Sequence, residues 1–229
     1  MRYSTLLLTL LLTACSSPPS QPEAGTAPAV SKAPPAAADV RPAARDSRHR
    51  LVAFGDSLTA GYGAPPGASY PDYLQKFIDA KKYPWQVINA GVSGDTTTGG
   101  LSRLPSVLDE KPEIVILELG ANDGLRGLPV DSSRGNLDEM IRAFRKAGAR
   151  VVLAGMTLPP NYGPEYIKPF EKMYRDLAAQ HQAKLIPFLL AGVGGNPSLM
   201  QRDGLHPTAQ GNEIVAANVM RVIEPLLAK

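Results

Sequence analysis

Short apolar runs alternate with segments whose apolar residues recur at helical spacing through residues 51–229. A short, unbroken apolar run fits a strand that is buried on both faces, whereas apolar residues three and four positions apart mark one face of a helix. Strands and helices that alternate in this way build a parallel sheet with helices on both of its faces. We therefore expect an α/β fold of three layers, α/β/α, around a mostly parallel sheet of about five strands.

The expected elements follow one another at similar intervals. Either Asp131 or Ser132 could cap the third long helix, and Gly148 would end it. In such sheets ligands bind beyond the carboxyl ends of the strands, so the loops at 55–57, 91–96 and 120–123 should meet at one edge. Strands are expected at 51–54, 86–89, 113–119, 151–154 and 184–187, and helices at 70–82, 97–108, 137–144, 169–182 and from 207 to 222 or beyond.

The first of these loops presents Ser57 after a turn at Gly55. Glycine suits a position where the backbone comes close to another group, so this turn could expose the serine hydroxyl to a ligand. In isolation such a serine more often belongs to an ordinary strand-to-loop transition and caps the next helix. A serine hydroxyl becomes a nucleophile when a histidine, oriented by a carboxylate, takes its proton. The interpretation of Ser57 therefore depends on whether the chain supplies such a base.

One of the chain's three histidines is well placed to be this base. His49 precedes the first expected strand and would lie roughly 20 Å from Ser57, at the opposite end of that strand. His181 falls at the end of an expected helix, where a histidine commonly interacts with the helix dipole. His206 follows Asp203 by three residues in a loop before the last helix, so this carboxylate could orient the imidazole. On spacing alone, a capping aspartate beside a surface histidine explains the pair equally well.

Four segments together resemble the sequence blocks of the GDSL esterases and lipases, also called SGNH hydrolases. Residues 55–58, Gly-Asp-Ser-Leu, resemble the first block, and residues 93–96, around Gly94, resemble the second. Residues 120–123, with Asn122, resemble the third block, and Asp203 with His206 resembles the last. The blocks stand in the family's order, and the resemblance spans residues 51–229. It implies the family's flavodoxin-like α/β/α fold and a serine hydrolase that acts on ester bonds.

The resemblance also implies a role for each residue of the site. Ser57 would attack an acyl carbonyl, His206 would take and return the serine proton, and Asp203 would orient His206. The backbone N–H groups of Ser57 and Gly94 and the side-chain amide of Asn122 would form the oxyanion hole. This set of residues predicts hydrolysis through an acyl-enzyme on Ser57.

Two further acids, Asp56 and Asp123, stand in turns beside these groups. We expect both to brace their loops through hydrogen bonds to backbone N–H groups. We expect no metal site, because one cysteine and three scattered histidines form no ligand set. The glycine-containing segment 91–100 lacks the lysine of a phosphate-binding loop, and we expect no cofactor.

The first fifty residues differ in composition from the rest. After Arg2, an apolar run at 5–13 is too short to span a bilayer and is typical of a secretion signal. The run ends in Leu-Thr-Ala-Cys at 12–15, which resembles the lipobox of bacterial lipoproteins. This resemblance implies a lipoprotein signal peptide at 1–14 and lipidation of Cys15. The alternative is a stray cysteine in an ordinary signal peptide.

Residues 15–50 would hold the lipidated Cys15 and a proline- and alanine-rich tether that we expect to be disordered, with the SGNH hydrolase domain at 51–229. The residue after Cys15 is Ser16 and not an aspartate, which resembles the pattern of lipoproteins sorted to the outer membrane. We therefore expect a lipid-anchored protein of the bacterial cell envelope, on the periplasmic face of the outer membrane. Six of the 24 basic and three of the 21 acidic residues precede Leu51, so the domain itself has balanced charge. Such a domain has no basic stripe for nucleic acid, and we expect a monomer.

The expected substrates are acyl esters and thioesters, such as aryl esters and lysophospholipids. The segment at 157–165, rich in proline and glycine around Tyr162, could wall the acyl site or be a plain surface loop. One alternative keeps the triad but makes the protein an O-deacetylase of cell-envelope carbohydrate. A more remote alternative is a non-catalytic envelope lipoprotein, which would predict a decayed triad.

Overall fold

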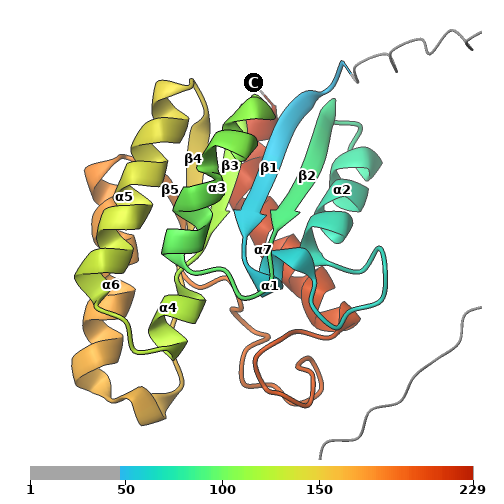
Figure 1. Cartoon of the computed structure of the whole chain (residues 1–229). Helices are drawn as coiled ribbons and strands as arrows, with labels where there is room; N and C mark the ends of the chain where they lie inside the picture. The colour runs from blue at the N-terminus through green and yellow to red at the C-terminus, as the bar shows by residue number, and fades with distance from the viewer. Residues whose placement is uncertain (1–46, 229) are drawn as a thin grey trace, which may run out of the picture. The chain divides into compact units, whose positions relative to one another are not determined.

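The computed structural model describes residues 47–228, and its centre is a sheet of five parallel strands (Figure 1). The order of the strands is β2-β1-β3-β4-β5. In β1, Phe54 lies beside Ala90 of β2 and beside Leu117 of β3. This sheet confirms the predicted parallel architecture. The strands are β1 (His49–Gly55), β2 (Trp85–Gly91), β3 (Ile114–Glu118), β4 (Arg150–Ala154) and β5 (Lys184–Ile186).

Helices cover both faces of the sheet and complete the three predicted layers (Figure 1). On one face α2 (Tyr70–Ala80) packs against α7 (Ala209–Leu227). On the other face α5 (Val130–Lys146) packs between α3 (Thr97–Asp109) and α6 (Pro164–Gln180). The short helices α1 (Ser57–Ala60) and α4 (Ala121–Leu125) follow the carboxyl ends of β1 and β3, and a 3-10 turn, η1 (Pro160–Tyr162), follows β4.

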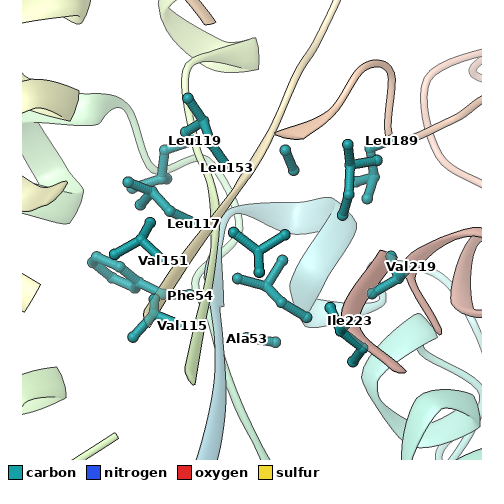
Figure 2. Close-up of a cluster of buried hydrophobic side chains, with 14 of the residues drawn as sticks. Ala53, Phe54, Val115, Leu117, Leu119, Val151, Leu153, Leu189, Val219 and Ile223 are labelled. Atoms are coloured by element: carbon teal, nitrogen blue, oxygen red, sulfur yellow. The ribbon is translucent and has the colours of Figure 1, made fainter. Parts of the chain in front are cut away.

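The apolar core lies on both sides of the central strands. The side chains of β3 are buried along its whole length, because each face of the sheet meets a helical layer. Phe54 packs edge-on against Phe144 of α5, with 5.7 Å between the ring centroids. Figure 2 shows Val219 and Ile223 of α7 on the opposite side of the sheet from Phe54. With both faces covered, the loops beyond the strand ends are left to build a site.

Two helices begin earlier than predicted. α5 begins after Pro129 without a side-chain cap, so neither Asp131 nor Ser132 has the predicted capping role. α6 begins at Pro164, earlier than predicted, and Pro169 lies inside it. The first turn of a helix tolerates Pro164 because its backbone nitrogen needs no partner there.

The first strand also begins earlier than predicted. His49 is already in β1, where it lies beside Trp85, and its N–H donates to the carbonyl of Pro84 at 2.9 Å. His49 and Arg50 therefore belong to the sheet and not to the tether. The predicted signal peptide and Cys15 lie outside the described residues. Among residues 47–228, the structure contains no helix with the length and apolar character needed to cross a bilayer.

Candidate active site

A tight turn between β1 and α1 presents Ser57. Ser57 is the first residue of α1, and Asp56 caps this helix by accepting the N–H of Leu58 at 3.0 Å. The capping role thus falls to Asp56, and the hydroxyl of Ser57 stays available. Gly55 is needed because of a close approach: a Cβ at this position would lie 2.1 Å from Thr59 Oγ1 and 2.6 Å from the carbonyl oxygen of Glu118.

A buried carboxyl group, Glu118 at the end of β3, supports this turn. Its Oε2 accepts the hydroxyl of Thr59 at 2.7 Å and the N–H of Asp56 at 3.2 Å, while its Oε1 has no hydrogen-bond partner among the described residues. Burial and the neighbouring charge of Asp56 raise the pKa of Glu118 well above its usual range. Burial also raises the pKa of Asp56, to about 6. Glu118 therefore holds its proton to a higher pH than a solvated glutamate does, and the nearby carboxylate of Asp56 adds to this effect.

His206 lies within hydrogen-bonding distance of both of its predicted partners. Its Nε2 is 2.8 Å from Ser57 Oγ, and its Nδ1 is 2.6 Å from Asp203 Oδ2. The other oxygen of Asp203 accepts the N–H groups of Leu205 and His206 at 2.9 and 3.1 Å. Gly204 adopts a φ of 69° in this turn, which lets the carboxylate reach an imidazole only three residues ahead.

Asp203 stays ionised at neutral pH. Partial burial would raise the pKa of Asp203, but the hydrogen bonds from the His206 side chain and from the two N–H groups outweigh it and lower this pKa to about 2. An ionised Asp203 accepts a hydrogen bond from the N–H at Nδ1 of His206, which keeps the ring proton on this nitrogen. Nε2 is then the nitrogen that can accept the proton of Ser57.

Gln201 ties the histidine loop to the segment that follows α1. Its Nε2 donates to the carbonyl of Tyr62 at 2.7 Å and to that of Pro207 at 2.9 Å. Its backbone N–H donates to the carbonyl of His206 at 2.7 Å. One side chain thus fixes the distance between the loop that carries His206 and the turn that carries Ser57.

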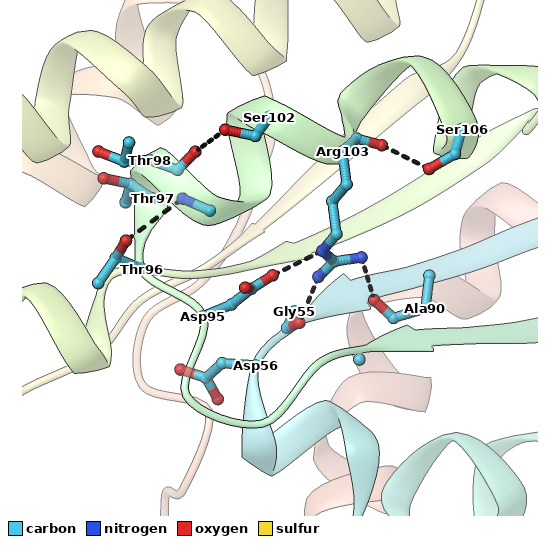
Figure 3. A network of polar contacts seen from close by, with 12 residues as sticks. Gly55, Asp56, Ala90, Asp95, Thr96, Thr97, Thr98, Ser102, Arg103 and Ser106 are labelled. Atoms are coloured by element: carbon cyan, nitrogen blue, oxygen red, sulfur yellow. Dashed lines mark hydrogen bonds and ion pairs between the residues drawn. The ribbon is translucent and has the colours of Figure 1, made fainter.

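Arg103 of α3 holds the loop that contains Gly94 (Figure 3). Its guanidinium donates to Asp95 Oδ2 at 2.6 Å, to the carbonyl of Ala90 at 2.7 Å and to the carbonyl of Gly55 at 2.8 Å. These bonds join the ends of β1 and β2 to the second loop. Gly94 itself has a φ of 85°, which disfavours any other residue, and a Cβ there would meet nothing within 4 Å.

The three predicted oxyanion donors line one cavity but differ in their present partners. The N–H groups of Ser57 and Gly94 have no acceptor within residues 47–228. The amide of Asn122, in α4, donates to Asp56 Oδ2 at 3.0 Å and to the carbonyl of Asp95 at 2.9 Å. Both hydrogens of this amide have acceptors, so a substrate oxygen would take the place of one of them.

Asp123 braces the start of α3, as predicted for this residue and for Asp56. Its carboxylate accepts the N–H of Thr97 at 2.8 Å, the hydroxyl of Thr97 at 2.6 Å and the hydroxyl of Ser133 at 3.1 Å. The short helix with Asn122 is thereby joined to the loop with Gly94. Both predicted bracing roles are confirmed.

A cavity of about 570 Å³ opens beside Ser57 and His206. Residues 156–160 form part of its wall, which agrees with one of the two interpretations of segment 157–165. Tyr162 does not line the cavity, and its hydroxyl instead donates to the carbonyl of Leu125 at 2.8 Å. The wall is mainly apolar and includes Leu125, Met156, Leu158, Pro160, Phe188 and Leu190.

The other two histidines take no part in the site. His49 pairs with Glu113 at 2.8 Å, at the far end of β1. His181 follows α6 and pairs with Asp138 at 2.6 Å, while burial and neighbouring arginines lower its pKa. In the part of the chain from 47 to 228, no cluster of three or more histidine, cysteine, aspartate or glutamate side chains could hold a metal ion.

The sequence motifs do not include Glu118, Arg103 or Gln201, which the structure places around the site. Glu118 could have been found from its place at the end of an otherwise apolar strand, because a buried acid needs a hydrogen-bond partner. Asp95 precedes α3 and Arg103 lies within it, so no helical spacing indicated their salt bridge or the two carbonyl partners of Arg103. No sequence pattern points to Gln201.

A model of the GDSL-like lipase/acylhydrolase family matches residues 53–214. The chain belongs to this family. Esterase TesA of Pseudomonas aeruginosa is 44% identical to this GDSL hydrolase over 178 residues, which are 77% of this chain and 89% of the relative. The crystal structure of TesA gives a TM-score of 0.75 and is matched over 78% of this chain and 99% of its own.

Two further relatives of this GDSL hydrolase have related names. An arylesterase of Vibrio mimicus is 42% identical over 175 residues, 76% of this chain and 88% of the relative. Thioesterase 1/protease 1/lysophospholipase L1 of Escherichia coli is 36% identical over 188 residues, 82% of this chain and 88% of the relative. This GDSL hydrolase is thus an enzyme that hydrolyses ester bonds.

Proposed function

We propose that Ser57, His206 and Asp203 hydrolyse acyl esters through an acyl-enzyme. Ser57 Oγ attacks the carbonyl carbon while its proton passes to His206 Nε2, 2.8 Å away. The bond from the carbonyl carbon to the alcohol oxygen then breaks, and His206 returns the proton to that oxygen. Water then attacks the carbonyl carbon of the acyl-enzyme while His206 takes its proton. The bond to Ser57 Oγ breaks, His206 returns the proton to Ser57, and the acid is released. The hydrogen-bonded chain from Ser57 to Asp203 is the observation that carries this proposal.

The negative charge that develops on the carbonyl oxygen meets three donors. The N–H groups of Ser57 and Gly94 are ready to donate to it. The amide of Asn122 gives up one of its two present acceptors, Asp56 or the carbonyl of Asp95, to join them. Donors of this kind stabilise the transition state more than the ground state, because the charge is present only in the former.

The substrates in this proposal are esters and thioesters of short to medium acyl chains, including aryl esters and lysophospholipids. An apolar cavity of about 570 Å³ beside Ser57 supports an acyl chain longer than acetate. The names of the relatives, esterase, arylesterase and thioesterase/lysophospholipase, support the same classes. Deacetylation of a glycan finds less support, since acetyl needs no such cavity. The intact triad speaks against the non-catalytic alternative.

The proposed place of action is the periplasmic face of the outer membrane, with the enzyme anchored through lipidated Cys15. Residues 12–15 and Ser16 support this placement by their resemblance to lipoprotein signals. A monomer suffices for the proposed chemistry, because Ser57, Gly94, Asn122, Asp203 and His206 all come from one chain.

The substrate classes are tested with a panel of esters and the full-length protein in detergent. Aryl esters of increasing acyl length, a lysophospholipid and an acetylated glycan are compared by kcat/KM, with Ser57→Ala as the control. We expect acyl esters longer than acetate to be preferred and Ser57→Ala to be inactive on all of them. Activity confined to acetate, with sugar esters preferred, would contradict the proposed substrates. Hydrolysis by Ser57→Ala would contradict the proposed nucleophile.

A further inference from the structure

The exposed apolar side chains gather at the catalytic edge of the domain. Tyr62, Val92 and Leu205 are the large hydrophobic residues of the described part that are well exposed, at 55%, 44% and 41%. They lie in the segments after α1, after β2 and before α7. Tyr62 and Leu205 line the cavity together with His206, whereas Val92 does not. An apolar surface thus flanks His206. Val92 is an exposed apolar residue outside the cavity and can serve as a control.

Tyr62 is held in place despite its exposure. Its N–H donates to the carbonyl of Ser57 at 3.0 Å, and its own carbonyl accepts from Gln201 at 2.7 Å. The glycines on both sides, Gly61 and Gly63, have φ values of 78° and 70°, so the backbone turns sharply around the tyrosine. The ring packs on the imidazole of His206, with 4.7 Å between the centroids. A fixed, half-exposed aromatic ring is suited to bind an apolar group from solution.

The position of Tyr62 beside His206 places its ring near the alcohol half of the ester. In the reaction proposed above, Nε2 of His206 must come within hydrogen-bonding distance of the leaving alcohol oxygen. The alcohol half of the ester therefore emerges beside the imidazole and next to the ring of Tyr62. The acyl half has the apolar cavity formed by the loops after β4 and β5.

We propose that Tyr62 is a specificity-determining residue that binds the alcohol half of the ester and favours alcohols with an aromatic ring. This inference rests on the proposed roles of Ser57 and His206. An aromatic contact of this kind corresponds to about a 2- to 12-fold preference in kcat/KM. The preference concerns the alcohol and is independent of the length of the acyl chain.

The test compares two esters that share the butyryl group and are both esters of primary alcohols, benzyl butyrate with an aromatic ring and methyl butyrate without one. The full-length protein in detergent is assayed as wild type, Tyr62→Ala, Tyr62→Phe and Val92→Ala. We expect Tyr62→Ala to lower kcat/KM for benzyl butyrate about 2- to 12-fold more than for methyl butyrate, chiefly through KM. Tyr62→Phe keeps the ring and should keep the preference. Val92→Ala should leave it unchanged.

Each other outcome overturns the proposal. An equal loss on both esters, seen in kcat, would make Tyr62 a residue that only positions His206. An unchanged preference in Tyr62→Ala would show that the ring binds no alcohol. The Tm of each variant shows that the fold is intact, which we expect because the Tyr62 side chain is largely exposed. Failure of the proposed function is recognised separately, by hydrolysis of both esters in Ser57→Ala.

Discussion

In the proposed mechanism, Asn122 exchanges one of its present hydrogen-bond acceptors for the substrate oxygen. Its amide already donates to Asp56 and to the carbonyl of Asp95, so it is oriented before a substrate oxygen arrives. A donor that is already oriented needs little reorientation when charge develops, beyond the release of one present acceptor.

Removing this donor should lower turnover while leaving binding nearly unchanged. We expect Asn122→Ala to reduce kcat by ~10²- to 10³-fold with a small change in KM. The matched control is Asn218→Ala, which removes a half-buried asparagine whose amide donates to the carbonyl of Ala191 outside the site. A loss of less than about tenfold in Asn122→Ala would remove Asn122 from the oxyanion hole.

The raised pKa of Glu118 leads us to expect that the stability of the fold depends on pH. Its pKa is raised in the folded protein, so the unfolded chain loses this proton near the ordinary value of 4.5 while the folded chain keeps it. Stability therefore decreases as the pH rises above the unfolded value, until the folded pKa is reached. Asp56, with a folded pKa of about 6 against 3.8, adds a decrease of the same sign at lower pH.

Glutamine at position 118 keeps the shape of the protonated acid but cannot ionise. We expect the free energy of unfolding of Glu118→Gln to fall less than that of the wild type between pH 5 and pH 8, as measured by urea denaturation. Glu139→Gln, on the exposed face of α5, should follow the wild type. Parallel curves for Glu118→Gln and the wild type would contradict the raised pKa of Glu118 in the folded protein.

At the scale of elements, one side chain secures the carboxyl ends of β1 and β2. Arg103 contacts Gly55, Ala90 and Asp95, and its guanidinium lies 4.3 Å from the centroid of the Phe54 ring. The planar guanidinium can serve several acceptors at once, which an ammonium group cannot do in the same geometry.

Loss of this guanidinium should affect both stability and catalysis. We expect Arg103→Met to lose about 2–3 kcal/mol of unfolding free energy, because polar groups are left without their partner. We also expect a lower kcat, because the loop with Gly94 is no longer tied to β1, and Arg103→Lys should be intermediate. Arg142→Met, at a largely exposed arginine of α5, is the control for loss of charge. Wild-type kcat in Arg103→Met would show that the loop is held by other contacts.

Most long elements could be predicted because their apolar residues follow the period of a strand or a helix. β3 is one residue shorter than predicted at each end, and α3 extends one residue beyond its predicted end. α1 and α4 could not be predicted in this way, since helices of four and five residues are too short to show a period. Pro169 concealed the true start of α6, because proline inside a helix is normally a sign of its boundary.

The motif residues of the candidate site could be predicted from the sequence, but the residues that hold its loops in place could not. Ser57, Gly94, Asn122 and His206 stand in local motifs and line one cavity, and Asp203 joins them through its contact with His206. Glu118, Arg103 and Gln201 act through contacts between segments far apart in the chain, such as the 2.8 Å bond from Arg103 to the carbonyl of Gly55. Contacts of this kind depend on the packing of the whole fold and leave no local pattern.

At the scale of the whole molecule, the proposed anchor joins the domain to a membrane. Wild-type protein expressed in a bacterium should incorporate labelled palmitate and fractionate with the outer membrane, since several acyl chains give stable anchoring. Cys15→Ala should lose the label, whereas Ser16→Ala, next to it, should retain it. Equal labelling of wild type and Cys15→Ala would contradict lipidation at this residue.

The central claim is that Ser57 is the nucleophile of a single acyl-transfer site. The most direct measurement is the intact mass of the protein after reaction with a fluorophosphonate, which forms a covalent bond with an activated serine. The proposed mechanism predicts one adduct on the wild type, a loss of esterase activity in proportion to the adduct, and no adduct on Ser57→Ala. An adduct of the same yield on Ser57→Ala, or full activity in labelled wild type, would contradict it.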